Sequence, residues 1–291
     1  IEKGYFDQLG LTFQEIQITQ SADVTAPLTQ GQIDIAGTAF APGLYNAIAR
    51  GVDVQAVADN GQLQPNLSGS AVVVKKGQLA NYGSDWCALK GKKVVGVAKV
   101  DGFYATLLKA LQSCNLSESD VDATNPGFAA VNLALTNGSA DVGFNVEPYV
   151  SQGVQQGLIE IWHQADVAWP NQQMNMLLYG PQFLKNTDAA LRFMVAYMVG
   201  VRDYDRDIAP GGDQKELGII LAKHLPVKDP NAYSKMIMMG ITSNGAINTQ
   251  ALGEEVQLFQ KSGSIQPGAV NLGWVTNDIR DQALTYLGPA K

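Results

Sequence analysis

The sequence predicts a two-lobed α/β protein in which each lobe is a mostly parallel sheet flanked by helices, followed by a helical C-terminal third. Three observations predict this fold. Short strand-like runs alternate with helical runs through residue 168. The alternation restarts once, which indicates two α/β units. The chain has 291 residues, more than one hydrophobic core usually accommodates.

The first unit begins with LTFQEIQI, whose alternating apolar and polar residues predict a strand. Two helical runs, SADVTAPLTQG and APGLYNAIARG, then end at Gly31 and Gly51, since glycine commonly terminates a helix. The strand-like runs IDIAG and VDVQAVAD follow these two helices in turn. This order is a βαβ pattern, which favours a parallel sheet.

The second unit starts after SGSAVVVKKG with a strand predicted from Lys93 to Ala98, and it is complete by residue 168. From NMLLYG onward the strand signals stop and long helical patterns take over, with Asp188 near a helix start and Gly263 at a helix end. We therefore expect one lobe from residues 1–74 plus 170–291 and the other from 77–168. Hinge strands are expected near 72–76 and 168–180.

Composition excludes several classes of function. The chain carries 20 Lys and Arg against 27 Asp and Glu, a net charge of −7, so a nucleic acid would be repelled. The most apolar window, ALRFMVAYMVGV, is shorter than a bilayer-spanning helix and contains Arg192. The chain opens on Ile1 without the pattern of a signal peptide, so any export signal is expected to be absent from this sequence.

Two cysteines flank one predicted strand and helix. Cys87 precedes the strand, and Cys114 ends the helix FYATLLKALQSC that follows it. Because the helix returns antiparallel to the strand, both thiols are expected at the same end of the unit. Either a disulfide or two ordinary half-buried thiols fits this placement, and a disulfide would indicate an oxidising compartment.

One sequence motif occurs twice in the chain. LTQGQIDIAGTAFAP begins at Leu28 and LTNGSADVGFNVEPY begins at Leu135. In each copy a helix ends at glycine, a short strand follows, and Thr38 or Asn145 stands where that strand ends. Any α/β protein contains such a step once, but two copies in two lobes predict a pair of facing sheet edges, where ligands bind in open α/β folds.

The chain resembles a known family in the runs QGQIDIAGTAFAPGLYNAIARGVDVQAVA, DWCALKGKKVVGVAKVDGFYATLLKAL, ALTNGSADVGFNVEPYV and FQKSGSI. In this order they resemble the periplasmic solute-binding proteins of ABC importers for nitrate, sulfonate and taurine, the SsuA/THI5-like, NMT1-like family. The resemblance implies a type II periplasmic binding protein fold, a small-molecule ligand, a membrane permease as partner and no chemistry. It also implies a monomer, a periplasmic or extracellular location, and a further strand and ligand-contacting loop ahead of EKGYFDQLGL.

Carried over position by position, the resemblance implies a set of cleft-lining residues from both lobes. The first lobe is expected to contribute Thr38, Ala39, Phe40, Asn60, Gly61 and Asn175, and the second Asp101, Gly102, Phe103, Tyr104, Phe128, Asn145 and Glu147.

Two acids in that set bear on the ligand. Asp101 is either a helix N-cap or a carboxylate facing the ligand, and Glu147 is either a first-turn glutamate or an acceptor for a ligand N–H. If they face the cleft, they favour a zwitterion or a nitrogen-containing aromatic over a pure anion. Aromatic rings for stacking are candidates at Phe40, Phe103, Tyr104, Phe128 and Trp162.

Two other classes of protein remain as alternatives. A THI5-like enzyme that forms a pyrimidine needs a histidine and a cysteine-rich cluster, whereas this chain has His163 and His224 only, and its two cysteines are not clustered with either in the sequence. The ligand-binding half of a transcription regulator would need a helix-turn-helix segment upstream. We expect no catalytic residues, no metal site and no cofactor.

Overall fold

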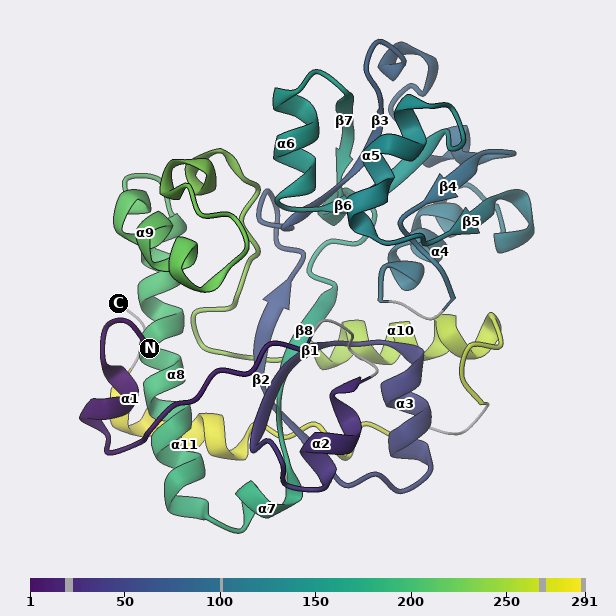
Figure 1. Cartoon of the computed structure of the whole chain (residues 1–291). Coiled ribbons are helices and arrows are strands. Elements are labelled where there is room, and N and C mark those ends of the chain that lie inside the picture. Colours follow the sequence, from purple (N-terminus) through teal and green to yellow (C-terminus); the bar gives the residue numbers. More distant parts are fainter. Residues whose placement is uncertain (19–22, 100–101, 267–270, 289–291) are drawn as a thin grey trace.

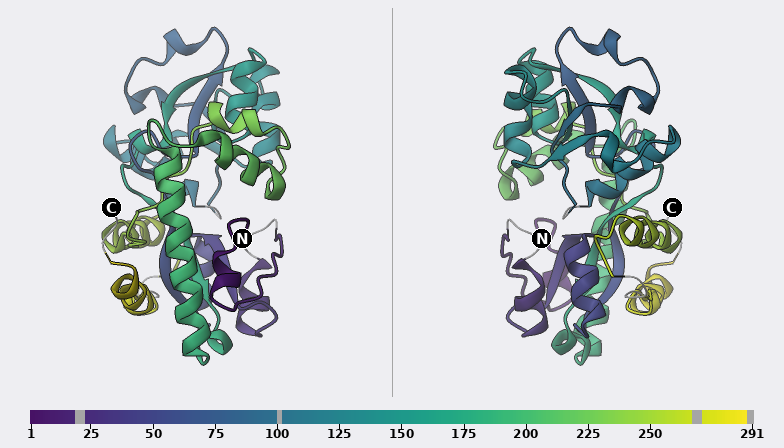
Figure 2. Two further views of the ribbon diagram at one scale, coloured as in Figure 1. Left: turned by 90° about the vertical axis from the view of Figure 1, so that its left-hand side faces the viewer. Right: turned by 90° about the vertical axis from the view of Figure 1, so that its right-hand side faces the viewer.

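The computed structural model describes residues 1–18, 23–99, 102–266 and 271–288. Its strands form two sheets, one above the other in Figure 1, and Figure 2 shows the same division from two sides. The predicted α/β fold with two sheet-containing halves and a helical C-terminal third is confirmed.

The first sheet has three strands in the order β1-β8-β2. These are β1 (Ile35–Ala39), β8 (Gln173–Tyr179) and β2 (Gln55–Gln62). The helices associated with this half are α1 (Tyr5–Gln8), α2 (Thr25–Thr29), α3 (Pro42–Ala49), α7 (Pro181–Leu184), α8 (Thr187–Ile208), α10 (Thr249–Lys261) and α11 (Asp278–Leu287). We call this part the lower half.

The second sheet has five strands in the order β5-β4-β6-β3-β7. These are β3 (Ser70–Lys75), β4 (Lys93–Val95), β5 (Asp122–Thr124), β6 (Val142–Val146) and β7 (Ile159–Gln164). With it lie α4 (Phe103–Ser113), α5 (Phe128–Thr136), α6 (Tyr149–Gln155) and the 3-10 turns η2 (Leu79–Asn81), η3 (Trp86–Leu89) and η4 (Glu118–Asp120). We call this part the upper half. The remaining elements are η5 (Ala165–Val167), α9 (Gln214–His224) and η6 (Pro230–Lys235).

Strand pairing differs from the mostly parallel sheets that the sequence predicts. In the lower half, β8 pairs antiparallel with both β1 and β2. In the upper half, β4 pairs parallel with β5 and β6, but β3 pairs antiparallel with β6 and β7. The βαβ rhythm correctly gives β1 and β2 the same direction. It does not show that β8, more than a hundred residues later, enters between them.

The predicted strand LTFQEIQI is absent, because residues 11–18 pair with no strand in the described part of the chain. Phe13 and Ile16 are 38% and 56% exposed. The ring of Phe13 stacks on Phe6, with centroids 4.8 Å apart. An alternating pattern indicates a half-buried strand only where a neighbouring strand satisfies its backbone.

Both copies of the doubled motif form the same local structure. After α2 and after α5 the chain turns at Gly31 and Gly138, whose φ angles are 71° and 78°. These left-handed conformations favour glycine. The strands β1 and β6 follow, and Pro42 and Pro148 stand at the starts of α3 and α6. Neither N-cap residue, Ala41 or Pro148, caps its helix with a side chain.

The chain crosses between the halves in three places that lie side by side. Residues 63–69 lead into β3, residues 165–172 lead back to β8, and residues 236–240 run alongside the first. The first two crossings exchange hydrogen bonds between Leu63 and residues 171 and 172 (2.7 and 3.0 Å). The first and third are joined by Gly69 N–H donating to Met238 O (3.1 Å). The hinge segment predicted near 72–76 lies largely within β3, whereas that predicted near 168–180 overlaps the second crossing and β8.

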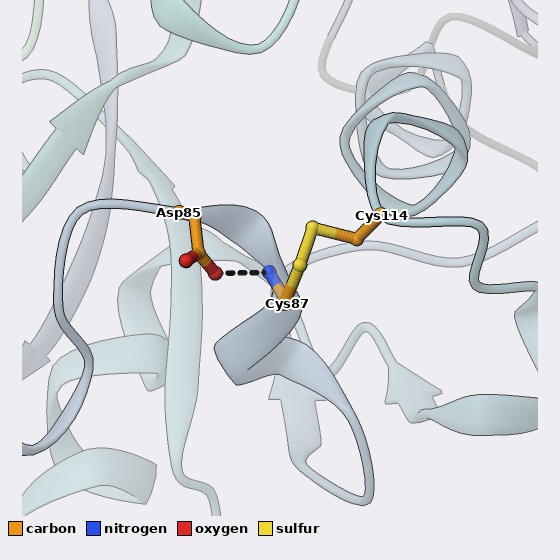
Figure 3. Close-up of side chains that lie close together, drawn as sticks. All are labelled: Asp85, Cys87 and Cys114. Carbon is orange, nitrogen blue, oxygen red and sulfur yellow. Dashed lines mark hydrogen bonds between the residues drawn. A yellow bond between two sulfur atoms is a disulfide. The ribbon is translucent and has the colours of Figure 1, made fainter.

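The two cysteines form a disulfide, which is one of the two arrangements that the sequence allows, the other being two free thiols. Cys87 on η3 and Cys114 at the end of α4 have Cα atoms 5.2 Å apart, and their bond is drawn in Figure 3. Asp85 Oδ1 accepts a hydrogen bond from Cys87 N–H (2.9 Å). Although these three residues cluster, sulfurs bonded to one another are not available as thiolate metal ligands.

Replacing Cys87 and Cys114 together by serine is expected to lower the free energy of unfolding by about 3–4 kcal/mol. The bridge spans a sequence separation of 27 and restricts the unfolded chain accordingly. Urea denaturation of the variant measures the loss, and the parent under reducing conditions is the matched control. Two reactive thiols in the denatured, non-reduced parent would contradict the bridge.

Candidate ligand-binding cleft

Asn175 lies at the end of the lower sheet where β1 and β2 finish and the central strand β8 begins. We call this end of the strands the sheet edge. Asn175 pairs in register with Ala39 of β1 on one side and with Gly61 of β2 on the other. Both neighbours are small, and a Cβ atom at residue 61 would come within 2.9 Å of Asn175 Nδ2. Asn175 is half-buried. Because it pairs with β1 on one side and β2 on the other, it lies in the middle of this end of the sheet.

A second half-buried carboxamide, that of Asn60, lies on the neighbouring strand β2. Asn60 Oδ1 accepts a hydrogen bond from the Tyr197 hydroxyl of α8 (3.1 Å). Its Nδ2 lies over Gly37, where a Cβ atom would come within 2.6 Å of it. Gly37 is exposed and Asn60 is half-buried. This face of the sheet therefore presents two amides over small residues.

Asp59 fixes the position of this edge. Its side chain is fully buried. Oδ1 accepts from Gly61 N–H (2.8 Å) and Gln173 Nε2 (2.7 Å), and Oδ2 accepts from Thr242 N–H (2.7 Å) and its hydroxyl (3.0 Å). Burial raises the pKa of Asp59, and the hydrogen bonds oppose that rise. The sequence interpretation did not include this residue, although an acid directly before Asn-Gly at a strand end was a usable signal.

Thr38 and Phe40 point away from the amide face. Thr38 is 8% exposed, and Phe40 is fully buried with its ring 5.8 Å from those of Tyr45 and Trp274. The backbone of Phe40 nevertheless reaches the upper half, because a Cβ atom at Gly102 would lie 2.6 Å from Phe40 O. The two halves thus touch where β1 ends and α4 begins, and only glycine fits at residue 102.

The predicted residues around the start of α4 pack mainly within the protein. The rings of Phe103 and Phe128 meet edge-to-face with centroids 5.8 Å apart. Tyr104 is 2% exposed, and its hydroxyl donates to Glu118. Burial is the main cause of the raised pKa of Tyr104. Asp101 lies outside the described residues.

Asn145 and Glu147 are both held by protein partners. Asn145 is fully buried, and its Nδ2 donates to Asn132 Oδ1 (3.1 Å). Glu147 Oε1 accepts from the Ser151 hydroxyl and from Ile237 N–H, both at 2.9 Å, and Oε2 accepts from Ser151 N–H (3.0 Å). Glu147 therefore joins α6 to the third crossing.

Trp162 is not near this edge. Its indole N–H donates to Gly83 O (2.8 Å), and its ring packs with those of Tyr82, Trp86 and His163. Of the residues predicted to line the cleft, three are half-buried at this end of the sheet, namely Ala39, Asn60 and Asn175, and Gly61 pairs with Asn175 but is buried.

Positive charge is sparse at the described strand ends. No arginine occurs in the described segments at this side of the two sheets, which are 37–41, 58–62, 96–99, 102–104, 125–128, 145–148 and 173–175. Their one lysine, Lys99, pairs with Glu118 (2.9 Å). The described edges thus offer amides and backbone groups to a ligand, with no guanidinium.

The histidines lie on different elements. His163 on β7 contacts the Trp86 ring, with centroids 4.5 Å apart, and burial lowers its pKa. His224, at the end of α9, lies between Glu15 (2.7 Å from Nδ1) and Glu2 (3.2 Å from Nε2). Neither histidine belongs to a cluster with the cysteines among the described residues.

The two sheets and the three crossings define the class of two-lobed α/β proteins. The sequence model described as NMT1/THI5 like matches residues 1–204, and the chain belongs to this family. No curated protein sequence matches the chain. No helix in the described ranges is both long and apolar enough to span a bilayer.

Solved structures of binding proteins share the fold. The periplasmic aliphatic sulphonate binding protein SsuA from Escherichia coli is 18% identical with a TM-score of 0.68, covering 94% of this chain and 85% of its own. The periplasmic nitrate-binding protein NrtA from Synechocystis PCC 6803 is 14% identical with a TM-score of 0.73, covering 99% and 85%. The ligand-binding component of an ABC-type import system from Staphylococcus aureus, with zinc bound, is 15% identical with a TM-score of 0.72, covering 96% and 92%.

Asp59→Asn is expected to reduce the free energy of unfolding by roughly 2–3 kcal/mol, because one oxygen becomes an amide that faces two donors. Asp53→Asn is the control, since Asp53 is an exposed acid six residues earlier and the charge change is the same. Urea denaturation at pH 7 compares the two. Equal stability of both variants would contradict the role of Asp59.

Proposed function

We propose that the chain is the substrate-binding protein of an ABC importer, which captures a small organic solute between its halves and delivers it to a membrane permease. The observation that carries the proposal is the contact between the strand ends of the two halves, where the backbone of Phe40 after β1 lies against Gly102 at the start of α4. Membership of the NMT1/THI5-like family and the likeness to SsuA and NrtA support it. The domain boundaries near residues 1–74 plus 170–291 and 77–168 belong to the same proposal.

The mechanism is closure about the three crossings. A solute that contacts both edges together binds the closed arrangement more tightly than the open one, and this difference in affinity drives closure. The chain needs no catalytic group for this task. The disulfide supports a location in the periplasm or outside the cell, where such bonds persist.

The ligand class follows from the groups at the accessible edge. The carboxamides of Asn60 and Asn175 each carry both a donor and an acceptor, which suits a ligand with neighbouring donor and acceptor atoms. The described strand ends offer no arginine to a bare anion. We therefore favour a zwitterion or a nitrogen-containing aromatic over nitrate or a simple sulfonate.

The enzymatic alternative has less support. Both cysteines are in one disulfide, and the two histidines lie on separate elements, so the described residues offer no histidine and cysteine cluster. The fold of a regulator's ligand-binding half is similar in architecture, and a gene neighbourhood with a permease and an ATPase distinguishes an importer from it.

A thermal-shift screen with taurine, an aminopyrimidine, nitrate and an alkanesulfonate tests the proposal. A compound that binds only the folded state adds about 2.7 kcal/mol of stability at a hundredfold excess over Kd. We expect taurine or the aminopyrimidine to raise Tm more than nitrate does. Native mass spectrometry of the purified protein tests for a retained solute. The absence of any shift together with the absence of a retained solute would contradict solute binding.

Asn175→Ala and Asn60→Ala are each expected to weaken binding of the compound with the largest shift by roughly tenfold, the value of one lost hydrogen bond. Isothermal titration calorimetry measures the change, and the Tm of each variant without the compound should remain close to that of the parent. Asn81→Ala, at an exposed position on η2, is the control. Parental affinity in both cleft variants would remove these amides from the site.

A further inference from the structure

A chain of buried polar side chains joins the two halves where α4 lies on α10 (Figure 1). The Thr106 hydroxyl of α4 donates to Gln172 Oε1 (2.7 Å). Gln172 Nε2 donates to Glu255 Oε2 of α10 (3.1 Å), and Glu255 Oε1 lies 3.2 Å from the Tyr45 hydroxyl of α3. All four residues are at most 1% exposed.

This connection passes through the hinge itself. Tyr45 and Glu255 belong to the lower half, Thr106 belongs to the upper half, and Gln172 stands at the end of the second crossing. A change at Glu255 therefore reaches the upper half through one side chain of the crossing. Nothing in the proposed solute-binding mechanism uses this group.

Among the described residues, no cation pairs with Glu255. On the elements packed around it, the ionisable side chains are Tyr45 on α3, Tyr104 and Lys109 on α4, and Glu254 and the exposed Lys261 on α10 itself. Lys109 Nζ pairs with Glu254 (2.7 Å) and lies over the Trp169 ring, 5.0 Å from its centroid. Tyr104 donates to Glu118.

A buried carboxylate without a cation is costly, so the neutral acid is favoured. Burial raises the pKa of Glu255 to about 8, although the bonds from Gln172 and Tyr45 act against the rise. The neutral acid fits the geometry, because Oε1–H can donate to the Tyr45 oxygen while Oε2 accepts from Gln172.

We propose that neutral Glu255 is a positioning residue that holds α10 against α4 through Gln172 and Thr106, and that its ionisation separates the two halves. This inference rests on the proposed function, and it takes the linked arrangement, with α10 against α4, as the closed one. Solute capture then weakens in alkaline solution, because that arrangement must expel or bury a charge. Any step that opens the halves and admits water to Glu255 favours loss of its proton.

The direction of the pH effect follows from linkage. A carboxyl whose pKa is higher in the closed state than in the open state holds its proton there, so closure is favoured at low pH and is lost as pH rises. The ratio of closed to open molecules falls by roughly tenfold for each unit by which the pKa of Glu255 drops on opening. The same argument makes global stability fall between its ordinary pKa of 4.5 and about 8.

The test measures the distance between the halves without any solute, so its outcome is separate from that of the proposed function. Spin labels are attached to Ala26→Cys on α2 and Gln155→Cys on α6, both exposed positions. Electron–electron double resonance then gives the distance distribution at pH 6 and at pH 9. The native disulfide stays oxidised throughout.

We expect the parent distribution to shift to longer distances at pH 9, whereas Glu255→Gln keeps the pH 6 distribution at both values. Glutamine is the permanent analogue of the neutral acid, since its amide can donate to Tyr45 and its carbonyl can accept from Gln172. Thr106→Val, which removes the link to α4 but leaves Glu255 buried, is expected to give the longer distances already at pH 6.

Two outcomes would overturn the proposal. One is an unchanged parent distribution from pH 6 to pH 9 while urea denaturation still shows the expected fall in stability, which would make Glu255 a buried acid without a role between the halves. The other is an equal shift in the parent and in Glu255→Gln, which would assign the pH effect to another group.

Discussion

The lower edge of the cleft depends on one buried carboxylate. Asp59 gathers the backbone of Gly61, the side chain of Gln173 and the loop at Thr242, so it fixes β2, β8 and the C-terminal segment relative to one another. Asn60 and Asn175 lie on the strands that it joins. Since a buried acceptor must be satisfied, any rearrangement of this edge would leave an oxygen without a donor.

The upper half uses its polar groups in a similar way. Asn145 lies near the end of β6, the strand that matches β1, and Glu147 follows it, yet their side chains bind other parts of the protein. Glu147 reaches the backbone of residue 237, ninety positions later. The strand ends after β1 and β6 are therefore alike in backbone and unlike in their accessible side chains. In the proposed function, the half-buried amides of Asn60 and Asn175 in the lower half are the groups that meet the solute.

Sequence reasoning found what is local. The helix ends at Gly31 and Gly138, the strands that follow them and the approach of Cys87 to Cys114 all depend on residues close together in the chain or within one βα unit. It did not find the insertion of β8 between β1 and β2, because a βαβ rhythm gives the direction of strands and not their neighbours. The same limit applies to the site. Apart from Gly61, which is two residues from Asp59, the hydrogen-bond partners of Asp59 and Glu255 lie more than eighty residues away, and no pattern around either residue shows those distant partners.

The three crossings also determine which motions the protein allows. They form a narrow ribbon, hydrogen-bonded side by side through Leu63, Gly69 and their partners. A ribbon of this kind bends easily across its thin direction, but sliding one strand along another breaks the bonds between them. In the proposed closure, the halves therefore swing toward and away from each other while resisting shear. Each closure of that kind returns the same two strand ends to the same register, so the proposed solute meets one geometry.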